Sequence, residues 1–499
     1  MQPSLDALLA RMRELRDLNG LIGLATWDQE TYLPPRAAEA RAFQLSTVQG
    51  LHHERLVDPA LGELLAWAGE QKELTGDQRA MVRVLKAERE RAVRVPKALV
   101  QALAEAQSRG LMAWREARKQ NRFAPFQPAL ERLLVLRREQ ADAYGHAGER
   151  YDALLEGYEP GMRVARLTPV LTALREALIP LVAALEAAPR KVGDLFQGRR
   201  FAVEGQWRLC LRLLEDMGFD LEAGRLDKSI HPFSSGQHPN DVRLTTALEE
   251  GSLDALFSTL HEGGHGLYEQ GYAEAHHRTP LAAAPSMGLH ESQSRLWENL
   301  VGRGRAFWTH YFPALREAFP EALAGVDLDT FHTGVNRVTP SLIRTEADEV
   351  TYNLHIVLRY ELELLLIHDE LPLQDLPEAW NERMRRFLGV TPPDDTQGVL
   401  QDIHWAWGEF GYFPTYALGN LYSASLYRAA GRALPGLEQG LARGELRPLR
   451  DWLRDNLHRQ GYRLPAEELV RQVTGQGLTD TDFLGYLKGK YGPLYGVTL

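Results

Sequence analysis

Two histidines and a glutamate stand close together in the segment His261, Glu262, Gly263, Gly264 and His265. Apolar residues precede this segment at helical spacing, so we expect it to form a helix. Because residues four apart share one face of a helix, His261 and His265 can direct both imidazoles at one metal ion. Glu262 lies one position further round, where it can act on a water beside the ion without binding the ion itself. The pattern therefore predicts a hydrolytic metal site of the His-Glu-x-x-His type, with Glu262 as its general base.

The third ligand of this site must come from elsewhere in the chain. A catalytic zinc ion commonly takes three protein ligands and keeps one position for water. The spacing of the sequence leaves three carboxylates open as candidates, namely Glu291, Glu298 and Glu269. The neighbouring pair His276 and His277 offers further nitrogen ligands, but its loop-like surroundings are better explained by a solvated loop.

The two glycines inside the motif point to close packing. Each glycine costs about 1 kcal/mol of helix stability relative to alanine, and a helix on the surface gains nothing from that cost. Glycine is useful where another element must approach the helix closely. We therefore expect the motif to lie on a packed helix that touches another part of the chain.

The elements that must position these residues are expected to be helices almost everywhere. Leucines recur at three- and four-residue spacing, which marks one apolar stripe per helix. Residues 225–246 are the exception, because glycine, proline, serine and asparagine cluster there between two short segments that contain β-branched residues, a hairpin-like signal. We predict a mainly α fold with a small β-sheet beside the metal-binding helix. No long linker interrupts the helices, so residues 1–499 should form a single catalytic unit with two lobes.

The composition is that of an ordinary globular protein and argues against two classes of partner. Of the 499 residues, 44% are hydrophobic and 25% are charged. The formal net charge of -10 provides no basic face for nucleic acid and no reason to expect an anionic membrane partner. Cys210 is the single cysteine, so no intrachain disulfide can form, and we expect it as a small buried residue.

Neither a secretion signal nor a transmembrane helix is expected. Charged residues such as Asp6 and Arg11 interrupt the apolar residues near the N-terminus. A transmembrane helix needs about 18 uncharged apolar residues in succession, and the sequence contains no such run. We therefore expect a cytoplasmic protein.

Several further motifs accompany the histidine motif, in a fixed order along the chain. They are Trp-Asp-Gln-Glu-Thr at 27–31, His-Pro-Phe at 231–233, Asp-Val-Arg-Leu-Thr at 241–245, His-Glu-Ser-Gln at 290–293, Ile-Arg-Thr-Glu-Ala-Asp at 343–348 and Gly-Val-Leu-Gln-Asp-Ile-His-Trp at 398–405. Together the motifs resemble those of the Taq-type carboxypeptidases, a family of zinc metallocarboxypeptidases within the zincins. The resemblance spans roughly residues 27 to 416.

The resemblance has consequences that the residues alone do not give. It implies that Glu291 is the third metal ligand, that the ion is zinc, and that cobalt can also support activity. It further implies a mostly helical fold with a deep central groove, a homodimer, and removal of single C-terminal residues from peptides with broad specificity.

The resemblance also suggests where the substrate is held. Aromatic residues follow the last motif, and Tyr412, Tyr416 and His404 are candidates for the donor that stabilises the oxyanion, with Tyr416 preferred. An exopeptidase must bind a free carboxylate, which arginine does best. Arg344 is the first choice and Arg243 the second.

Two further features are expected to border the substrate. His231 is an additional candidate for lining the site. Residues 244–246 are expected as an edge strand that pairs with the peptide backbone, which would explain broad specificity because such pairing ignores side chains.

Three functions therefore have to be distinguished. The leading hypothesis is a carboxypeptidase that releases one residue at a time. The first alternative is a helical oligopeptidase or dipeptidyl carboxypeptidase, and the second is a helical protein that binds metal without catalysis. The presence of Glu262 argues against the last, because metal binding alone does not need it.

Overall fold

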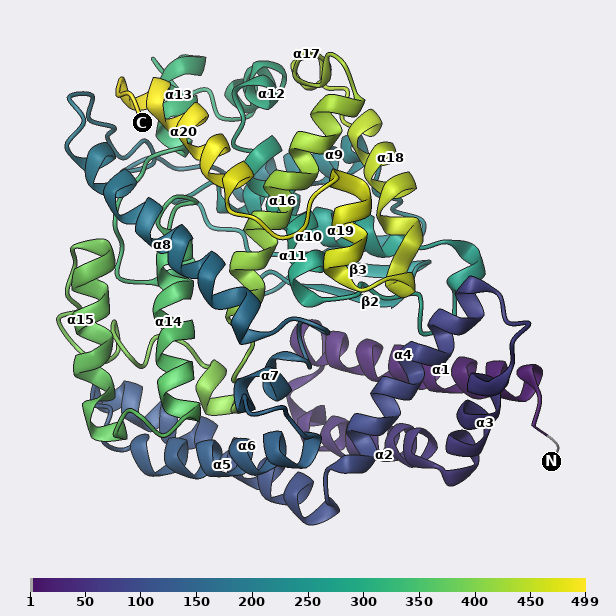
Figure 1. The fold of residues 1–499 in the computed structure, drawn as a ribbon. Coiled ribbons are helices and arrows are strands. Elements are labelled where there is room, and N and C mark those ends of the chain that lie inside the picture. The colour runs from purple at the N-terminus through teal and green to yellow at the C-terminus, as the bar shows by residue number, and fades with distance from the viewer. Residues whose placement is uncertain (1–2) are drawn as a thin grey trace.

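The structure, a computed structural model, describes residues 3–499 and is built almost entirely from helices (Figure 1). The first four helices lie at the lower right of Figure 1, around a small hydrophobic core to which Leu281 also contributes. Local sequence explains where two of them begin, because Ser4 caps the first, and Thr75 and Gln78 form a capping box at the fourth. These helices are α1 (Leu5–Thr31), α2 (Ala38–Val57), α3 (Pro59–Glu70) and α4 (Gly76–Arg94).

The remaining helices contribute to a much larger hydrophobic core, and a third, small core lies between α5 and α6. At the lower left and along the left side of Figure 1 lie α5 (Lys97–Gln120), α6 (Gln127–Tyr144), α7 (Arg150–Leu155), α8 (Val164–Glu186), α14 (Tyr352–Ile367) and α15 (Leu376–Leu388). The upper part contains α9 (Val203–Met217), α10 (Asp254–Gln270), α11 (Met287–Arg295), α12 (Arg305–Ala318), α13 (Leu328–Val335), α16 (Pro414–Ala433), α17 (Leu437–Leu441), α18 (Arg447–Asn456), α19 (Ala466–Thr474) and α20 (Thr481–Tyr495).

Short helical turns connect these elements. One of them, η3 (Leu296–Val301), is a π-helix that continues α11 directly. The others are 3-10 turns, namely η1 (Pro35–Ala37), η2 (Glu274–His276), η4 (Arg344–Glu346), η5 (Leu373–Asp375), η6 (His404–Trp407) and η7 (His458–Arg463). The prediction of a mainly α fold is confirmed.

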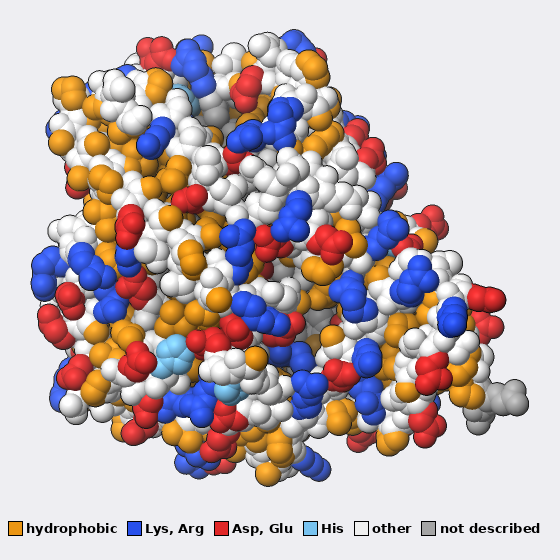
Figure 2. Space-filling view, viewed as in Figure 1, with side chains coloured by type: hydrophobic (Ala, Val, Ile, Leu, Met, Phe, Trp, Pro, Cys, Tyr) orange, Lys and Arg blue, Asp and Glu red, His pale blue; other side chains and the backbone are white. Residues whose placement is uncertain are grey.

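Helix α8 is the one helix among residues 3–499 whose length and apolar composition would allow it to cross a membrane. Its middle carries Arg175 and Glu176, and the leucine face that includes Leu171, Leu174 and Leu178 is buried. That face belongs to the main core and packs against α14 and α20. Elsewhere on the molecule, acidic and basic side chains are interspersed over the face that Figure 2 shows.

A three-stranded sheet lies beside α10, as predicted, but its pairing differs from the expected hairpin. The strand order is β1 (Gly224–Lys228), β3 (Asp241–Thr246), β2 (Ser234–His238). The two segments that the sequence pointed to, β1 and β3, pair in parallel, whereas the true hairpin joins β2 to β3. Strand β2 was missed because its residues, Ser-Ser-Gly-Gln-His, contain no apolar or β-branched side chain and read as a turn. It is held to β3 by backbone pairing.

Because β3 is the central strand, the expectation that residues 244–246 form a free edge is wrong. β3 pairs with β1 on one side and β2 on the other. Its buried side chains Val242 and Leu244 anchor it in the core instead, with Leu244 next to α10. The edges of the sheet are β1 and β2.

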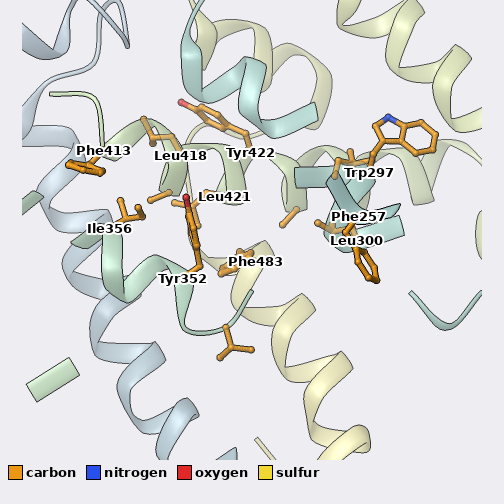
Figure 3. Close-up of a cluster of buried hydrophobic side chains, with 14 of the residues drawn as sticks. Phe257, Trp297, Leu300, Tyr352, Ile356, Phe413, Leu418, Leu421, Tyr422 and Phe483 are labelled. Atoms are coloured by element: carbon orange, nitrogen blue, oxygen red, sulfur yellow. The ribbon is translucent and has the colours of Figure 1, made fainter. Parts of the chain in front are cut away.

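The motif helix α10 lies in the interior, supported by large side chains from several elements. Figure 3 shows part of this core, which includes the following side chains: Phe257 of α10, Trp297 and Leu300 of η3, Tyr352 and Ile356 of α14, Leu418 and Leu421 of α16, and Phe483 of α20. Burial of aromatic and leucine side chains on this scale stabilises each helix by packing rather than by its own propensity.

Close approach of α10 and α11 explains one of the two glycines of the motif, as the sequence predicted. A Cβ atom at Gly264 would lie 2.4 Å from the carbonyl oxygen of Gln293 and 2.8 Å from the Cα atom of Ser294. At Gly263 it would lie 2.9 Å from a methyl group of Leu214. The first contact is with backbone, which cannot move aside without displacing α11. Gly264 therefore sets how near the two helices come.

We predict that Gly264→Ala lowers the free energy of unfolding, because the added methyl group must push α11 away from α10. Overpacking of this kind costs about 1–3 kcal/mol. Gly50 is a matched control, since it is exposed within α2 and a Cβ atom there would meet nothing within 4 Å. Gly50→Ala should raise the stability by up to about 1 kcal/mol. Equilibrium denaturation measures both changes, and equal stabilisation by both alanines would contradict the prediction.

Candidate metal centre and groove

The three residues predicted as metal ligands lie together. His261 and His265 come from α10 and Glu291 from α11, and one ligand atom of each lies within 4.8 Å of the others. The Oε2 atom of Glu291 is 3.6 Å from Nε2 of His261 and 3.3 Å from Nε2 of His265. Within residues 3–499 this is the one group of three or more such side chains compact enough to hold an ion. Two imidazoles and a carboxylate are a donor set that suits zinc.

A second carboxylate orients the first imidazole. Nδ1 of His261 lies 2.8 Å from Oε2 of Glu298, one of the alternative third ligands. If Nδ1 carries the proton that Glu298 accepts, the lone pair of Nε2 is free and faces Glu291. Glu298 therefore lies behind the ligand cluster and supports it.

The second imidazole, His265, is fixed by stacking. Its ring lies on the ring of His290, with centroids 4.4 Å apart and an interplanar angle of 16°. Glu269, the other alternative third ligand, lies 3.1 Å from Nε2 of His290 and outside the cluster. Burial lowers the pKa of His265 to about 3, which keeps this imidazole in the neutral form that binds metal.

Glu291 is held ionised by its surroundings. Ser294 donates to its Oε2 over 3.0 Å and Arg295 donates to its Oε1 over 2.7 Å. Burial opposes ionisation, but Arg295 and the two histidines outweigh it and hold the pKa of Glu291 well below its ordinary value. Arg295 also reaches Glu298 at 3.3 Å, so one guanidinium supports both carboxylates.

Glu262 has the environment of a general base. Its side chain is buried next to His261, and burial raises its pKa to about 7, with Glu291 contributing in the same direction. A base whose pKa lies near neutrality can both accept and return a proton. A cation bound at the neighbouring cluster would favour the ionised form.

A groove leads to the cluster. A cavity of about 520 Å³ is lined by His265 and Glu291 together with aromatic side chains from distant parts of the chain, namely Tyr158, Tyr412, Tyr416 and Tyr462. A second cavity of about 610 Å³ shares Glu269, Ala284 and His290 with it and extends to α1. The two cavities together run from the N-terminal helices to the ligand cluster, and Ser234 of the edge strand β2 borders them near the cluster.

The candidates for the oxyanion donor lie at different depths. The rings of Tyr412 and Tyr416 meet edge to face at 5.3 Å, and both line the cavity beside Glu291. Burial raises the pKa of Tyr412 to about 12 and holds that of Tyr416 well above its ordinary value, so both hydroxyls keep their protons. His404 lies behind them, 5.3 Å from the Tyr412 ring, and is not among the residues that line this cavity. Burial lowers the pKa of His404 to about 4.

Arg344 lies beneath the tyrosines, in a buried cluster of charges. Its guanidinium donates to Asp402 over 3.0 and 2.8 Å and to the hydroxyl of Tyr352 over 3.0 Å. Arg359 donates to the other oxygen of Asp402 over 2.6 Å. Two guanidiniums thus share one carboxylate, and the Arg344 guanidinium lies 5.1 Å from the centre of the Tyr416 ring.

The other two substrate candidates lie farther out. Arg243 forms a two-point contact with Asp241 and covers the ring of Trp27 at 4.4 Å. His231 is exposed in the turn between β1 and β2, where its carbonyl oxygen accepts a hydrogen bond from Ser229. Neither is among the residues that line the cavity beside the cluster.

Sequence reasoning missed several residues of this site. Arg295 follows Glu291 at an interval of four, so helical spacing was a signal that could have placed it on the same face as Glu291. Glu298 was predicted as an alternative third ligand, whereas its contact in the structure is with Nδ1 of His261. Tyr158 and Tyr462 gave no signal, because each comes from a segment far from every motif.

The predicted histidine pair has a different surrounding from the one expected. His276 is buried, and its Nε2 lies 3.2 Å from Asp77, whereas His277 packs edge to face against His238. His276 therefore belongs to the contact between the N-terminal helices and the rest of the chain, whereas His277 contacts β2.

Comparison with known proteins gives these residues a family context. The family model described as carboxypeptidase Taq (M32) metallopeptidase matches residues 7–491. The chain is 46% identical to thermostable carboxypeptidase 1 of Thermus thermophilus, over 98% of both chains. It is 37% identical to carboxypeptidase 1 of Bacillus subtilis, over 97% of both chains.

Solved structures agree with this similarity. The crystal structure of an M32 carboxypeptidase from Deinococcus radiodurans R1 matches with a TM-score of 0.96 at 44% identity, covering 99% of both chains. A carboxypeptidase of Pyrococcus furiosus matches with a TM-score of 0.95 at 35% identity, covering 98% of this chain and 99% of that one.

We predict that Glu298→Gln weakens metal binding although it removes no ligand, because the loss of charge frees the imidazole of His261 to change its tautomer. Substitutions of such supporting groups typically cost about 10–100-fold in affinity. Glu346→Gln is the control, since Glu346 is an exposed carboxylate on the same small cavity as Glu298. Equilibrium dialysis of the metal-free proteins against Zn²⁺ measures the dissociation constants, and identical values for the two variants would contradict the prediction.

Proposed function

Because the chain belongs to the carboxypeptidase Taq (M32) family of metallopeptidases, we propose that His261, His265 and Glu291 hold a zinc ion and that Glu262 is the general base. The chain is a metallocarboxypeptidase, and its substrates are peptides. The observation that carries the proposed residue assignment is the meeting of two imidazoles and one carboxylate within 4.8 Å, next to a buried glutamate.

Different residues of the chain have different roles in hydrolysis. Bound at this cluster, zinc supplies a Lewis acid that lowers the pKa of a water and polarises the scissile carbonyl. Glu262 accepts a proton from the attacking water and returns it to the leaving amine. Tyr416, with Tyr412 and His404 as alternatives, donates a hydrogen bond to the oxygen on which negative charge develops. Such a donor typically lowers the activation free energy by about 3 kcal/mol.

Recognition of the substrate carboxylate is proposed for Arg344. The cluster of Arg344, Arg359 and Asp402 holds two cations and one anion, and a buried excess of positive charge attracts a free carboxylate. Arg344 faces the ring of Tyr416, which lines the groove, so a modest side-chain movement would expose the guanidinium to a substrate terminus. Arg243 and His231, which lie farther from the candidate metal ligands, remain the other candidates for binding the substrate.

Backbone pairing with the peptide is now proposed for β2 rather than β3. Strand β2 is an edge of the sheet, and its residue Ser234 borders the cavity beside Glu291. An extended peptide added to this edge would be held through its main chain, which supports broad specificity.

Three properties complete the proposal. Cobalt should replace zinc with retention of activity, because its ligand preferences are similar. A homodimer is expected from the resemblance, and a cytoplasmic location is consistent with a chain whose single cysteine rules out an intrachain disulfide.

We predict that Glu262→Gln abolishes hydrolysis while zinc remains bound, because the amide cannot accept the proton of the attacking water. The loss of kcat should be at least about 100-fold. His265→Ala is the complementary variant, which should lose both zinc and activity. Rates are measured on a defined peptide and bound zinc by elemental analysis of the same samples. Retained activity in Glu262→Gln would remove Glu262 from its proposed role.

We predict that amidation of the C-terminus removes most of the activity toward a peptide, and that Arg344→Gln does the same to the free peptide. Hydrogen bonds to a charged group contribute about 1.5–3 kcal/mol each, so kcat/KM should fall by roughly 10–100-fold, mainly through KM. Arg243→Gln tests the second choice and should have little effect. Equal rates for the acid and the amide, or release of dipeptides, would favour the oligopeptidase or dipeptidyl carboxypeptidase alternative.

A further inference from the structure

A buried carboxyl group lies at the beginning of the helix that carries the third metal ligand. Glu159, in the loop between α7 and α8, is 2% exposed. The backbone N–H of Gly288, in the first turn of α11, donates to its Oε1, and the side chain of Ser286 is also hydrogen-bonded to it. A Cβ atom at Gly288 would lie 2.8 Å from the same oxygen, so glycine is needed for the carboxyl group to come this near.

This contact completes the hydrogen bonding of the first turn of α11. The first N–H groups of a helix have no partner within the helix. Here the N–H of Met287 donates to the carbonyl of Tyr158, that of Gly288 donates to Glu159, and that of Leu289 donates to the side chain of Ser286. Two of the three acceptors therefore come from one dipeptide outside the helix.

Within residues 3–499, Glu159 forms no ion pair. Burial is the largest influence on Glu159 and raises its pKa to about 8, and the groups that oppose this are the N–H of Gly288 and the hydroxyl of Ser286. A buried carboxyl group without a cation is costly, and the partial positive charge of a helix N-terminus offsets only part of that cost. A purely stabilising cap on the surface would avoid this cost, so the buried position calls for another explanation.

The same loop also forms part of the groove. Tyr158 and Pro160 line the cavity that contains His265 and Glu291, and the ring of Tyr158 meets that of Tyr412 edge to face at 5.3 Å. The dipeptide Tyr158 and Glu159 thus joins the wall of the groove to the helix of the ligand Glu291.

We propose that Glu159 is a positioning residue for the metal site: it fixes the first turn of α11, and through it the place of Glu291 relative to the imidazoles of α10. Glu291 is only three residues beyond Gly288, so a change in the first turn displaces its carboxylate directly. This inference rests on the proposed metal site.

The test compares three substitutions at one position by their affinity for Zn²⁺. Glu159→Gln keeps the length and an oxygen acceptor, and its dissociation constant should stay within about threefold of the wild-type value. Glu159→Asp keeps the carboxyl group but shortens its reach by one carbon–carbon bond, about 1.5 Å. Glu159→Leu removes the acceptor. The aspartate and leucine variants should each weaken zinc binding by about 10–100-fold, as substitutions of supporting groups do.

A matched control and a second readout separate positioning from general stability. Glu156→Gln changes a carboxylate of the same loop that pairs with Arg163. It should leave the zinc affinity unchanged. The melting temperature of each metal-free protein is recorded in parallel. If Glu159→Leu fails to fold, the comparison of zinc affinity between Glu159→Asp and Glu159→Gln decides the test.

The possible results separate the positioning role of Glu159 from the proposed metal site on which it rests. Wild-type zinc affinity in Glu159→Asp overturns the positioning role, whatever happens to the melting temperature, and so does equal weakening by the aspartate and glutamine variants. Failure of His265→Ala to reduce zinc binding instead overturns the proposed metal site itself.

Discussion

The close approach of α10 and α11 is the constraint on which the rest of the site depends. Gly264 lies against the backbone of Gln293 and Ser294, so the two helices touch without an intervening side chain. That contact brings the carboxylate of Glu291 to the imidazoles of His261 and His265. A ligand set drawn from two elements is only as well defined as the packing between them, because a shift of 1 Å is large on the scale of metal–ligand distances. The main core around α10, α14, α16 and α20 therefore contributes to the arrangement of the candidate metal ligands as well as to stability.

Much of the fold and the proximity of the three candidate ligands could be predicted from the sequence, for physical reasons that differ between residues. The spacing of His261 and His265 predicts that they lie on one face of a helix, since four residues make about one helical turn. Glu291 needed the family resemblance, because the spacing alone left Glu298 and Glu269 equally open. The structure brings Glu291 into the cluster and leaves the other two as partners of neighbouring histidines.

The features that escaped prediction are those set by tertiary contacts. Strand β2 carries no side-chain pattern, since its place is fixed by backbone pairing with β3. The tyrosines Tyr158 and Tyr462 line the groove from segments that have no motif and no periodic relation to it. Arg344 is expected from its motif to face a substrate, and no local pattern predicts that Asp402 and Tyr352 accept hydrogen bonds from it. Partners of buried charges are determined by the fold as a whole and cannot be derived from local spacing.

The buried charges differ in sign between two places beside the groove. At the candidate ligand cluster, three carboxyl groups (Glu262, Glu291 and Glu298) outnumber the two guanidiniums of Arg295 and Arg303, which suits a site that is to hold a divalent cation. At the opposite side of Tyr416, Arg344 and Arg359 outnumber Asp402, which suits a site that is to receive an anion. Tyr352 joins the two, because its ring lies against Arg295 and its hydroxyl is bonded to Arg344. If these residues have the roles proposed above, a peptide drawn into this field has one favourable orientation, with its terminal carboxylate toward the arginines and its last amide bond beside the candidate metal ligands.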